Sequence, residues 1–198
     1  MSHSVAPDAS LRTAIERHVV LPEAVWQDVR SRWRETVSCR KDEYLTKAGE
    51  VEKYFYLVLE GVQRLYYLTP EGNEVVLGFT FTGNFSGVHD SFVQQTPAQC
   101  YLQALSDTKL LGIRRKDLEA LYDRHPVIER WGRLFIQDIL FGRVQREVEL
   151  TTHSAEERYR DFIRRSPVPL QQVAQKHLAS YLNMTPETFS RQRANHVS

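Results

Sequence analysis

The chain has 198 residues, of which 41% are hydrophobic and 26% are charged, and its formal net charge is +1. This length allows one or two domains of ordinary globular composition. A charge so close to zero argues against a protein that coats nucleic acid along its whole surface. The charge is nevertheless uneven, because seven Lys and Arg residues oppose four Asp and Glu residues from Ser154 onward. This modest basic excess fits a nucleic-acid contact, and a solvated helical face would give it equally well.

No stretch approaches the roughly 20 apolar residues of a membrane span. The N-terminal residues MSHSVAPDAS also lack the basic and apolar pattern of a signal peptide. We therefore expect a cytoplasmic protein with no membrane partner. Cys39 and Cys100 lie far apart, without a CxxC motif or a His-rich neighbourhood, so we expect two buried thiols, no metal site and no cofactor.

The first part of the chain combines two helical segments with a series of short strands. Residues 11–19 and 23–36 show the apolar spacing of helices, and we expect them to cover the domain that follows. β-rich runs then alternate with turns rich in Gly, Pro and Asn. The expected strands are 43–47, 55–60, 62–68, 74–81, 101–105 and 109–113. Strands at this regular spacing predict an antiparallel barrel or a jelly roll.

The longest periodic segment is a helix predicted at 126–150, after a short helix at 117–123. A further helix at 155–164 and a Pro-broken link, SPVPLQQV, follow it. Its apolar stripe consists of Ile128, Trp131, Phe135, Ile139, Leu140, Val144 and Val148, and Leu134, Ile136 and Phe141 widen it. Such width implies two partners, the strand domain and a second copy of the helix, which Gly132 and Gly142 would allow to approach closely. Burial within one monomer is the alternative.

Residues 175–193, QKHLASYLNMTPETFSRQR, carry the signals of two short helices joined by a tight turn. Asn183 tolerates the left-handed φ that ends the first helix. Thr185 can cap the second helix, and Pro186 and Glu187 suit its first turn. These signals predict a helix-turn-helix whose second helix offers polar side chains to a DNA major groove. An ordinary helical hairpin that closes a small domain is the alternative.

A strand domain, then one long helix, then a helix-turn-helix resembles the family of the cyclic AMP receptor protein and FNR. Members of that family are bacterial transcription regulators that dimerise through the long helix. The resemblance covers roughly residues 11–195 and extends to local motifs. The similar segments are 55–61 (strand and glycine of the roll), 69–74 (its hairpin), 82–87 (the opening of its phosphate-binding cassette), and 156–159 and 177–191 (a short-tailed subgroup).

The resemblance implies an α+β fold with three parts. These are an N-terminal cyclic-nucleotide-binding-like β-roll (a double-stranded jelly roll) with flanking helices at 1–125, a long dimerisation helix at 126–153 and a helix-turn-helix domain at 154–198. It implies a DNA-binding transcription regulator that forms a homodimer, with double-stranded DNA, RNA polymerase and an unknown small-molecule effector as partners. The expected DNA-contacting residues are Lys176, Thr185, Glu187, Thr188, Ser190, Arg191 and Arg193. Among them Glu187 and Arg191 match the family's base- and phosphate-contacting positions, whereas Pro186 replaces a common Arg.

The cassette departs from the family where cyclic nucleotides are bound. Nucleotide-binding members follow the cassette glycine with a Glu and later carry an Arg followed by Ser or Thr. Here Gly87 is followed by Val88, and the later positions are Ala98 and Gln99. Neither replacement supplies charge to a phosphate, so we expect no response to cyclic AMP. The candidate effector-pocket residues are Phe85, Gly87, Val88, His89, Ala98 and Gln99.

Two other functions share parts of this pattern. A cupin-type enzyme has a similar strand domain but needs several metal ligands, and His89-Asp90 is the only such neighbouring pair in the strand region, so we expect no enzyme. A ligand- or protein-binding module that no longer binds DNA is the second alternative. It is favoured by the modest charge and by the few residues after Arg193, which leave no room for further strands.

Overall fold

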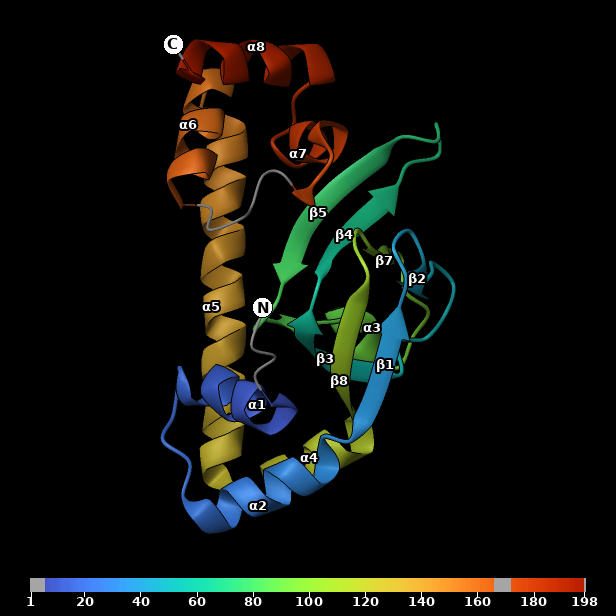
Figure 1. The fold of residues 1–198 in the computed structure, drawn as a ribbon, viewed down its shortest axis with the longest axis vertical. Coiled ribbons are helices and arrows are strands. Elements are labelled where there is room, and N and C mark those ends of the chain that lie inside the picture. Colours follow the sequence, from blue (N-terminus) through green and yellow to red (C-terminus); the bar gives the residue numbers. More distant parts are fainter. Residues whose placement is uncertain (1–5, 166–171, 198) are drawn as a thin grey trace.

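The computed structural model describes residues 6–165 and 172–197. A long helix runs beside a roll of two β-sheets, and the remaining helices gather mostly at the two ends of this helix (Figure 1). The order of elements confirms the predicted succession of roll, long helix and helix-turn-helix. Most of the predicted link at 166–173 lies outside the described residues.

Two N-terminal helices cover one end of the roll. Helix α1 (Pro7–Glu16) begins with a proline, which suits the first helical position, and α2 (Glu23–Arg32) follows it. Their inward residues are Leu11, Ala14 and Ile15 in α1 and Trp26 and Val29 in α2. The prediction that the second helix continues to Thr36 was wrong, because residues 35–39 pair with a distant strand and tertiary pairing overrides local periodicity.

The roll consists of two four-stranded antiparallel sheets that do not close into a barrel. One sheet has the order β1 (Glu35–Cys39), β8 (Thr108–Arg114), β3 (Tyr54–Glu60), β6 (Phe85–Ser86). The other has the order β2 (Tyr44–Thr46), β7 (Tyr101–Ala104), β4 (Val62–Leu68), β5 (Glu74–Phe81). All six predicted strands are present, and the jelly roll rather than the barrel is confirmed.

Strands β3 and β4 are joined by a single residue, Gly61, whose φ is +103°. A Cβ atom there would lie 2.5 Å from Oγ1 of Thr108 and 2.6 Å from the carbonyl oxygen of Asp107. Both the left-handed backbone and the close approach therefore require glycine. This connection passes the chain directly from one sheet to the other.

Two short helices flank the later strands. Helix α3 (His89–Gln94) was not predicted, since six residues are too few for a periodic signal. Helix α4 (Arg115–Arg124) was predicted and buries Leu118 and Leu121. It ends at His125, and Pro126 then begins the long helix.

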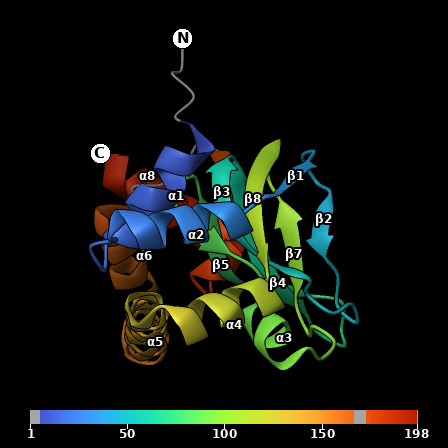
Figure 2. The ribbon, with the colours of Figure 1, turned by 90° about the horizontal axis from the view of Figure 1, so that it is seen from below.

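Helix α5 (Pro126–Thr152) has two different apolar faces. One face packs on the roll, where Trp131 contacts Phe85 at a ring distance of 5.1 Å and Phe135 contacts Phe55 at 5.6 Å. Figure 2 looks down α5 and shows the roll strands on one side of it. The opposite face exposes Leu140, Phe141, Val144 and Val148. The prediction of one stripe that includes Val144 and Val148 was therefore wrong, because a rotation of 100° per residue places them opposite Ile128.

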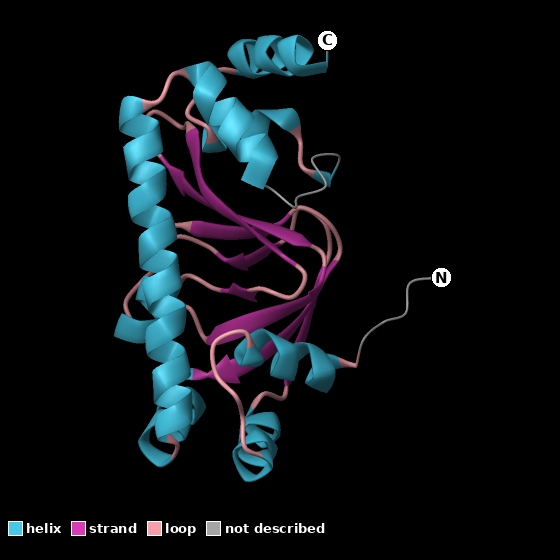
Figure 3. Ribbon diagram, turned by 90° about the vertical axis from the view of Figure 1, so that its left-hand side faces the viewer, coloured by secondary structure: helices cyan, strands magenta, loops and turns pink. Residues whose placement is uncertain are grey.

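The C-terminal helices form the predicted helix-turn-helix. Helix α6 (Ala155–Arg165) is followed by α7 (Gln175–Tyr181) and α8 (Pro186–Val197). The three helices lie together at the C-terminal end of α5, where α7 packs beside β5 (Figure 3). Asn183 has φ +52° in the turn, and Oγ1 of Thr185 accepts a hydrogen bond from the Thr188 amide at 3.2 Å. Ala179 is fully buried between the helices, and Phe189 packs on Tyr159. The capping and turn signals read from the sequence are confirmed.

The two cysteines differ in exposure. Cys39 is buried, as predicted, but Cys100 is only half-buried. Burial raises the pKa of the Cys39 thiol to about 11, which keeps it protonated and unreactive at neutral pH. Within residues 6–165 and 172–197, no helix is long and apolar enough to cross a membrane.

Candidate functional site

The outer face of α8 carries the residues predicted to read DNA. Glu187 and Arg191 are both exposed and four residues apart, so they share the face opposite the buried Phe189. Ser190 is exposed beside them. Arg193 is also exposed but follows Phe189 by four residues, which places it on the side toward α6. Burial raises the pKa of the Tyr159 hydroxyl, and the positive charge of Arg193 opposes this increase.

The remaining predicted DNA-contacting residues lie at the first turn of α8 and at the start of α7. The Thr185 hydroxyl is engaged as the helix cap and lies 3.2 Å from the Thr188 hydroxyl. Hydrogen bonds from its own backbone amide and from Thr185 lower the pKa of Glu187, so this carboxylate is ionised at neutral pH. Lys176 is exposed at the start of α7. A carboxylate and a guanidinium on one helix face are the groups that accept from cytosine and donate to guanine.

Helix α7 is attached to the roll by polar contacts that sequence reasoning missed. The Ser180 hydroxyl donates to the Glu74 carbonyl at 2.8 Å and accepts from the Val76 amide at 3.0 Å. Arg64 on β4 donates to Nδ1 of His177 at 2.8 Å. Because these partners are about a hundred residues apart, no local pattern identifies them. The orientation of the helix-turn-helix therefore depends on the edge strand β5 and its neighbour.

Arg64 is the centre of this buried contact. Its guanidinium binds both carboxylate oxygens of Glu74, at 2.5 and 3.0 Å, and donates to Gln103 at 2.8 Å. His177 is 7% exposed. Burial, and then the Arg64 charge, lower the pKa of His177 to about 4. His177 is consequently neutral at physiological pH and can act as the acceptor that Arg64 requires.

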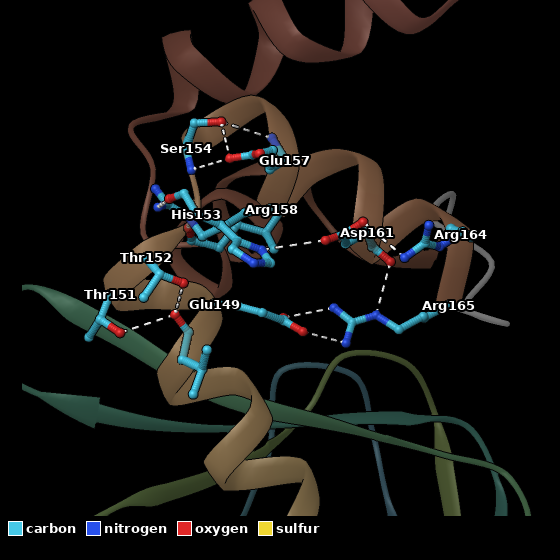
Figure 4. Close-up of polar contacts among 12 residues, drawn as sticks. Glu149, Thr151, Thr152, His153, Ser154, Glu157, Arg158, Asp161, Arg164 and Arg165 are labelled. Atoms are coloured by element: carbon cyan, nitrogen blue, oxygen red, sulfur yellow. Dashed lines mark hydrogen bonds and ion pairs between the residues drawn. The ribbon is translucent and has the colours of Figure 1, made fainter.

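A rigid corner connects the long helix to α6 (Figure 4). The Ser154 hydroxyl accepts from the Glu157 amide, while the Glu157 carboxylate accepts from the Ser154 amide at 2.8 Å, which is a capping box. Arg165 reaches back to Glu149 on α5 with two bonds of 2.5 and 2.7 Å. Asp161 lies 3.4 Å from His153 and 3.1 Å from Arg164. The angle between α5 and α6 is thus stabilised by charged pairs.

The candidate effector pocket is a cavity of about 620 Å³ between the roll and α5. Three of the six candidate residues, Phe85, Gly87 and His89, line it. The structure does not bring the other three candidates to its wall. Val88 and Ala98 are buried together in an apolar cluster with Leu102, and Gln99 is exposed.

The cassette is held by a carboxylate of the chain itself. The Glu52 side chain is 2% exposed and accepts from the Val88 amide at 3.1 Å and from the Thr46 hydroxyl at 2.7 Å. Burial raises the pKa of Glu52. The hydrogen bond from Val88 to Glu52 attaches the cassette to the loop before β3. Nothing in the sequence indicated that Glu52 would accept it. Val88 and Ala98 bring no charged group to the region where the family binds a phosphate.

We call this cavity of about 620 Å³ the roll cavity, and several polar side chains line it. Burial lowers the pKa of His89, whose Nδ1 has no hydrogen-bond partner among the described residues. Arg143 on α5 donates to the Leu77 carbonyl at 2.8 Å. Asp138 is paired with His18 of the loop after α1 at 2.8 Å. In the described part of the chain, no three His, Cys, Asp or Glu side chains are grouped as metal ligands would be.

Comparison with known proteins agrees with this arrangement. The cyclic nucleotide-binding domain family matches residues 36–125. The chain is 28% identical over 155 residues to the nitrogen fixation regulation protein FixK of Bradyrhizobium diazoefficiens, covering 72% of this chain and 63% of FixK. It is 26% identical over 170 residues to the fumarate and nitrate reduction regulatory protein of Escherichia coli, covering 77% and 64%. The chain thus spans less than two thirds of the length of these curated relatives.

Solved structures show the same fold. The structure of FixK2 from Bradyrhizobium japonicum matches with a TM-score of 0.72 and 23% identity, over 81% of this chain and 83% of FixK2. The catabolite activator protein of Thermus thermophilus matches with a TM-score of 0.54 and 22% identity, over 98% and 84%. At these identities the likeness concerns the fold alone.

Proposed function

We propose that this chain, which is similar in sequence and fold to regulators of the Crp/Fnr family, is a homodimeric transcription regulator that binds double-stranded DNA. The observation that carries the proposal is the outer face of α8, where Glu187 and Arg191 point away from the core of a capped helix-turn-helix. Regulation would take place in the cytoplasm, with RNA polymerase as a further partner. Nothing in this function requires catalysis.

The free face of α5 supports the homodimer. Phe141, Val144 and Val148 are 66%, 52% and 50% exposed and follow the spacing of three and four residues that packs two helices together. Leu140, 56% exposed, flanks them. A second copy of α5 would cover this surface and set two recognition helices against half-sites roughly 34 Å apart.

We propose further that the effector is not cyclic AMP bound in the manner usual for the family. Val88 and Ala98 are buried in one apolar cluster with Leu102. Nucleotide-binding members of the family have a Glu and an Arg at these two positions. An unpaired phosphate in such surroundings is costly to bury. The effector of the roll cavity would therefore be a different small molecule.

The test is DNA affinity at two salt concentrations, measured with the full chain and its best genomic fragment. Binding should weaken steeply with salt, since phosphate contacts release counterions. Arg191→Ala should cost about 1–3 kcal/mol if it reads a base with two hydrogen bonds. Arg193→Ala should cost less, and Arg115→Ala on the distant helix α4 serves as the charge-matched control.

Salt-independent binding would refute the DNA-binding proposal. Unchanged affinity in the Arg191→Ala variant would refute the proposed docking of α8. No DNA binding at any salt concentration, together with capture of a defined protein or ligand, would favour the alternative of a binding module that has lost contact with DNA.

A further inference from the structure

A second cavity, of about 310 Å³, lies where the roll, the long helix and the helix-turn-helix meet. This volume is within the roughly 300–1,000 Å³ of small-molecule sites. We call it the junction cavity. Its described walls come from β5, α5, α6 and the end of α7, and four aromatic rings contribute to them: Phe79, Phe81, Phe162 and Tyr181.

The junction cavity also has an excess of positive charge. Three arginines and one glutamate line it. Arg165 is neutralised by Glu149 through the two bonds at the corner of α5 and α6. Arg146 and Arg158 have no carboxylate within 4.0 Å among the described residues, and the residues outside that description include no Asp or Glu. Within residues 6–165 and 172–197, these two guanidinium groups therefore form no salt bridge, and Glu149 acts on Arg146 only at longer range.

Carbonyl oxygens are the acceptors of these two arginines. Arg146 donates to the Tyr181 carbonyl at 2.7 Å and stacks over the Tyr181 ring at 4.4 Å. Its Nε is buried without a hydrogen-bond partner among the described residues. Burial lowers the pKa of the Arg146 guanidinium. Arg158 donates to the carbonyls of Leu182 and His153 at 2.9 and 2.6 Å. A desolvated cation of this kind is stabilised when an anion approaches it.

We propose that the junction cavity binds a small aromatic carboxylate, with the carboxylate at Arg146 and Arg158 and the ring among the aromatic side chains. The size of the cavity and its aromatic wall favour an apolar body, and the two guanidinium groups favour a single negative charge that can accept several N–H bonds. The free face of α5 lies on the other side of that helix, so a second copy packed there would leave the junction cavity within one chain.

Occupancy of the junction cavity is coupled to the position of α7. The same two arginines hold the carbonyls at the C-terminal end of α7, and a bound carboxylate competes with those carbonyls for the N–H donors. The consequence for DNA affinity rests on the proposed function, whereas ligand binding itself does not.

The roll cavity adjoins the junction cavity, and two residues distinguish them. Arg158 lines only the junction cavity and Arg143 lines only the roll cavity. The experiment is calorimetry on the full chain, without DNA, using naphthoate, the neutral isostere naphthalenemethanol and inorganic phosphate. Naphthoate should bind, while the alcohol should bind about tenfold more weakly and phosphate should give no heat.

The variants locate the bound molecule. Arg158→Gln should weaken naphthoate binding by about tenfold, and Arg143→Gln should leave it unchanged. Gly142→Leu should also weaken binding, because a Cβ at Gly142 meets no atom within 4 Å and the longer side chain would fill space there. Gly142 lines both cavities, so only the comparison of Arg158→Gln with Arg143→Gln assigns the ligand to the junction cavity.

Three results would overturn the site: no binding of naphthoate at millimolar concentration, equal binding of the alcohol, or loss of binding in Arg143→Gln but not in Arg158→Gln. DNA affinity is measured afterwards, with and without saturating naphthoate. Naphthoate binding that leaves DNA affinity unchanged would overturn the coupling to α7. Failure to bind DNA at all would overturn the proposed function and leave the ligand site established.

Discussion

Mild acid should weaken the attachment of α7 to the roll, because His177 is buried in its neutral form. Its Nδ1 accepts from Arg64 at 2.8 Å, and protonation would put two positive charges at that distance. Lys176 adds to this repulsion, while Glu74 and Asp42 oppose it. Burial and the Arg64 charge together lower the pKa of His177 from 6.5 to about 4. His177→Gln should remove this sensitivity, since an amide oxygen accepts from Arg64 and does not titrate.

The direction follows from the protons bound in each state. Above pH 6.5 the His177 side chain is neutral in both the native and the unfolded state, so it contributes no pH dependence to the free energy of unfolding. As the pH falls from 6.5 towards 4, the unfolded state binds a proton that the native state does not, and stability is lost. The full shift corresponds to roughly 3 kcal/mol, and about 1.4 kcal/mol of it is lost by about pH 5.5.

Urea unfolding at about pH 8 and about pH 5.5 measures this loss. The wild type should lose about 1.4 kcal/mol more than His177→Gln between these conditions. Burial raises the pKa of Glu52 and lowers the pKa of His89, but both groups are present in both proteins, so their contributions cancel in the difference. His196→Gln, at an exposed site on α8, should follow the wild type. Equal pH dependence of the wild type and His177→Gln, or an NMR titration midpoint of His177 near 6.5, would refute the buried contact with Arg64.

Three further predictions concern the dimer, the effector and the hairpin of helices. Phe141→Asp should give a monomer in sedimentation at micromolar concentration, whereas Val20→Asp, at an exposed apolar site outside α5, should remain a dimer. A monomeric wild type would contradict the model. Calorimetry with millimolar cyclic AMP should show no binding, because Val88 and Ala98 provide no charge for its phosphate. A low micromolar dissociation constant would show that the phosphate-binding cassette was assigned to the wrong residues. Ala179→Leu should lower the free energy of unfolding in urea by about 1–3 kcal/mol through overpacking between α7 and α8, and an unchanged midpoint would contradict the packing of Ala179.

The sequence predicts well those elements whose signals are local. The turn at Asn183, the cap at Thr185 and the proline at the start of α8 each act within a few residues, so the helix-turn-helix could be located from the sequence alone. The six expected strands were found because turn residues separate them. Strand β6 has only two residues and α3 only six, and neither is long enough to show a period.

The attachment of α7 could not be predicted, because it joins distant residues. Arg64, Glu74 and His177 are ordinary polar residues in their own segments, and only the folded chain brings them together. Three of the six candidate effector-pocket residues lie away from the roll cavity for the same reason. Resemblance located the cassette, but whether a residue faces the cavity or the apolar cluster depends on distant strands, because Val88 and Ala98 are buried with Leu102 of β7.

The packing of α1 and α2 has a consequence for the order in which the chain can fold during synthesis. Their inward side chains share one hydrophobic core with Ile128 and Trp131 of α5, and His18 is bonded to Asp138. The N-terminal helices therefore cannot complete their burial until more than a hundred further residues have left the ribosome. Contacts so distant in sequence slow folding and leave apolar surface exposed to other chains in the meantime. A fragment that stops at residue 125 would carry this exposed surface permanently, so the roll needs the first turns of the long helix to become a folded unit.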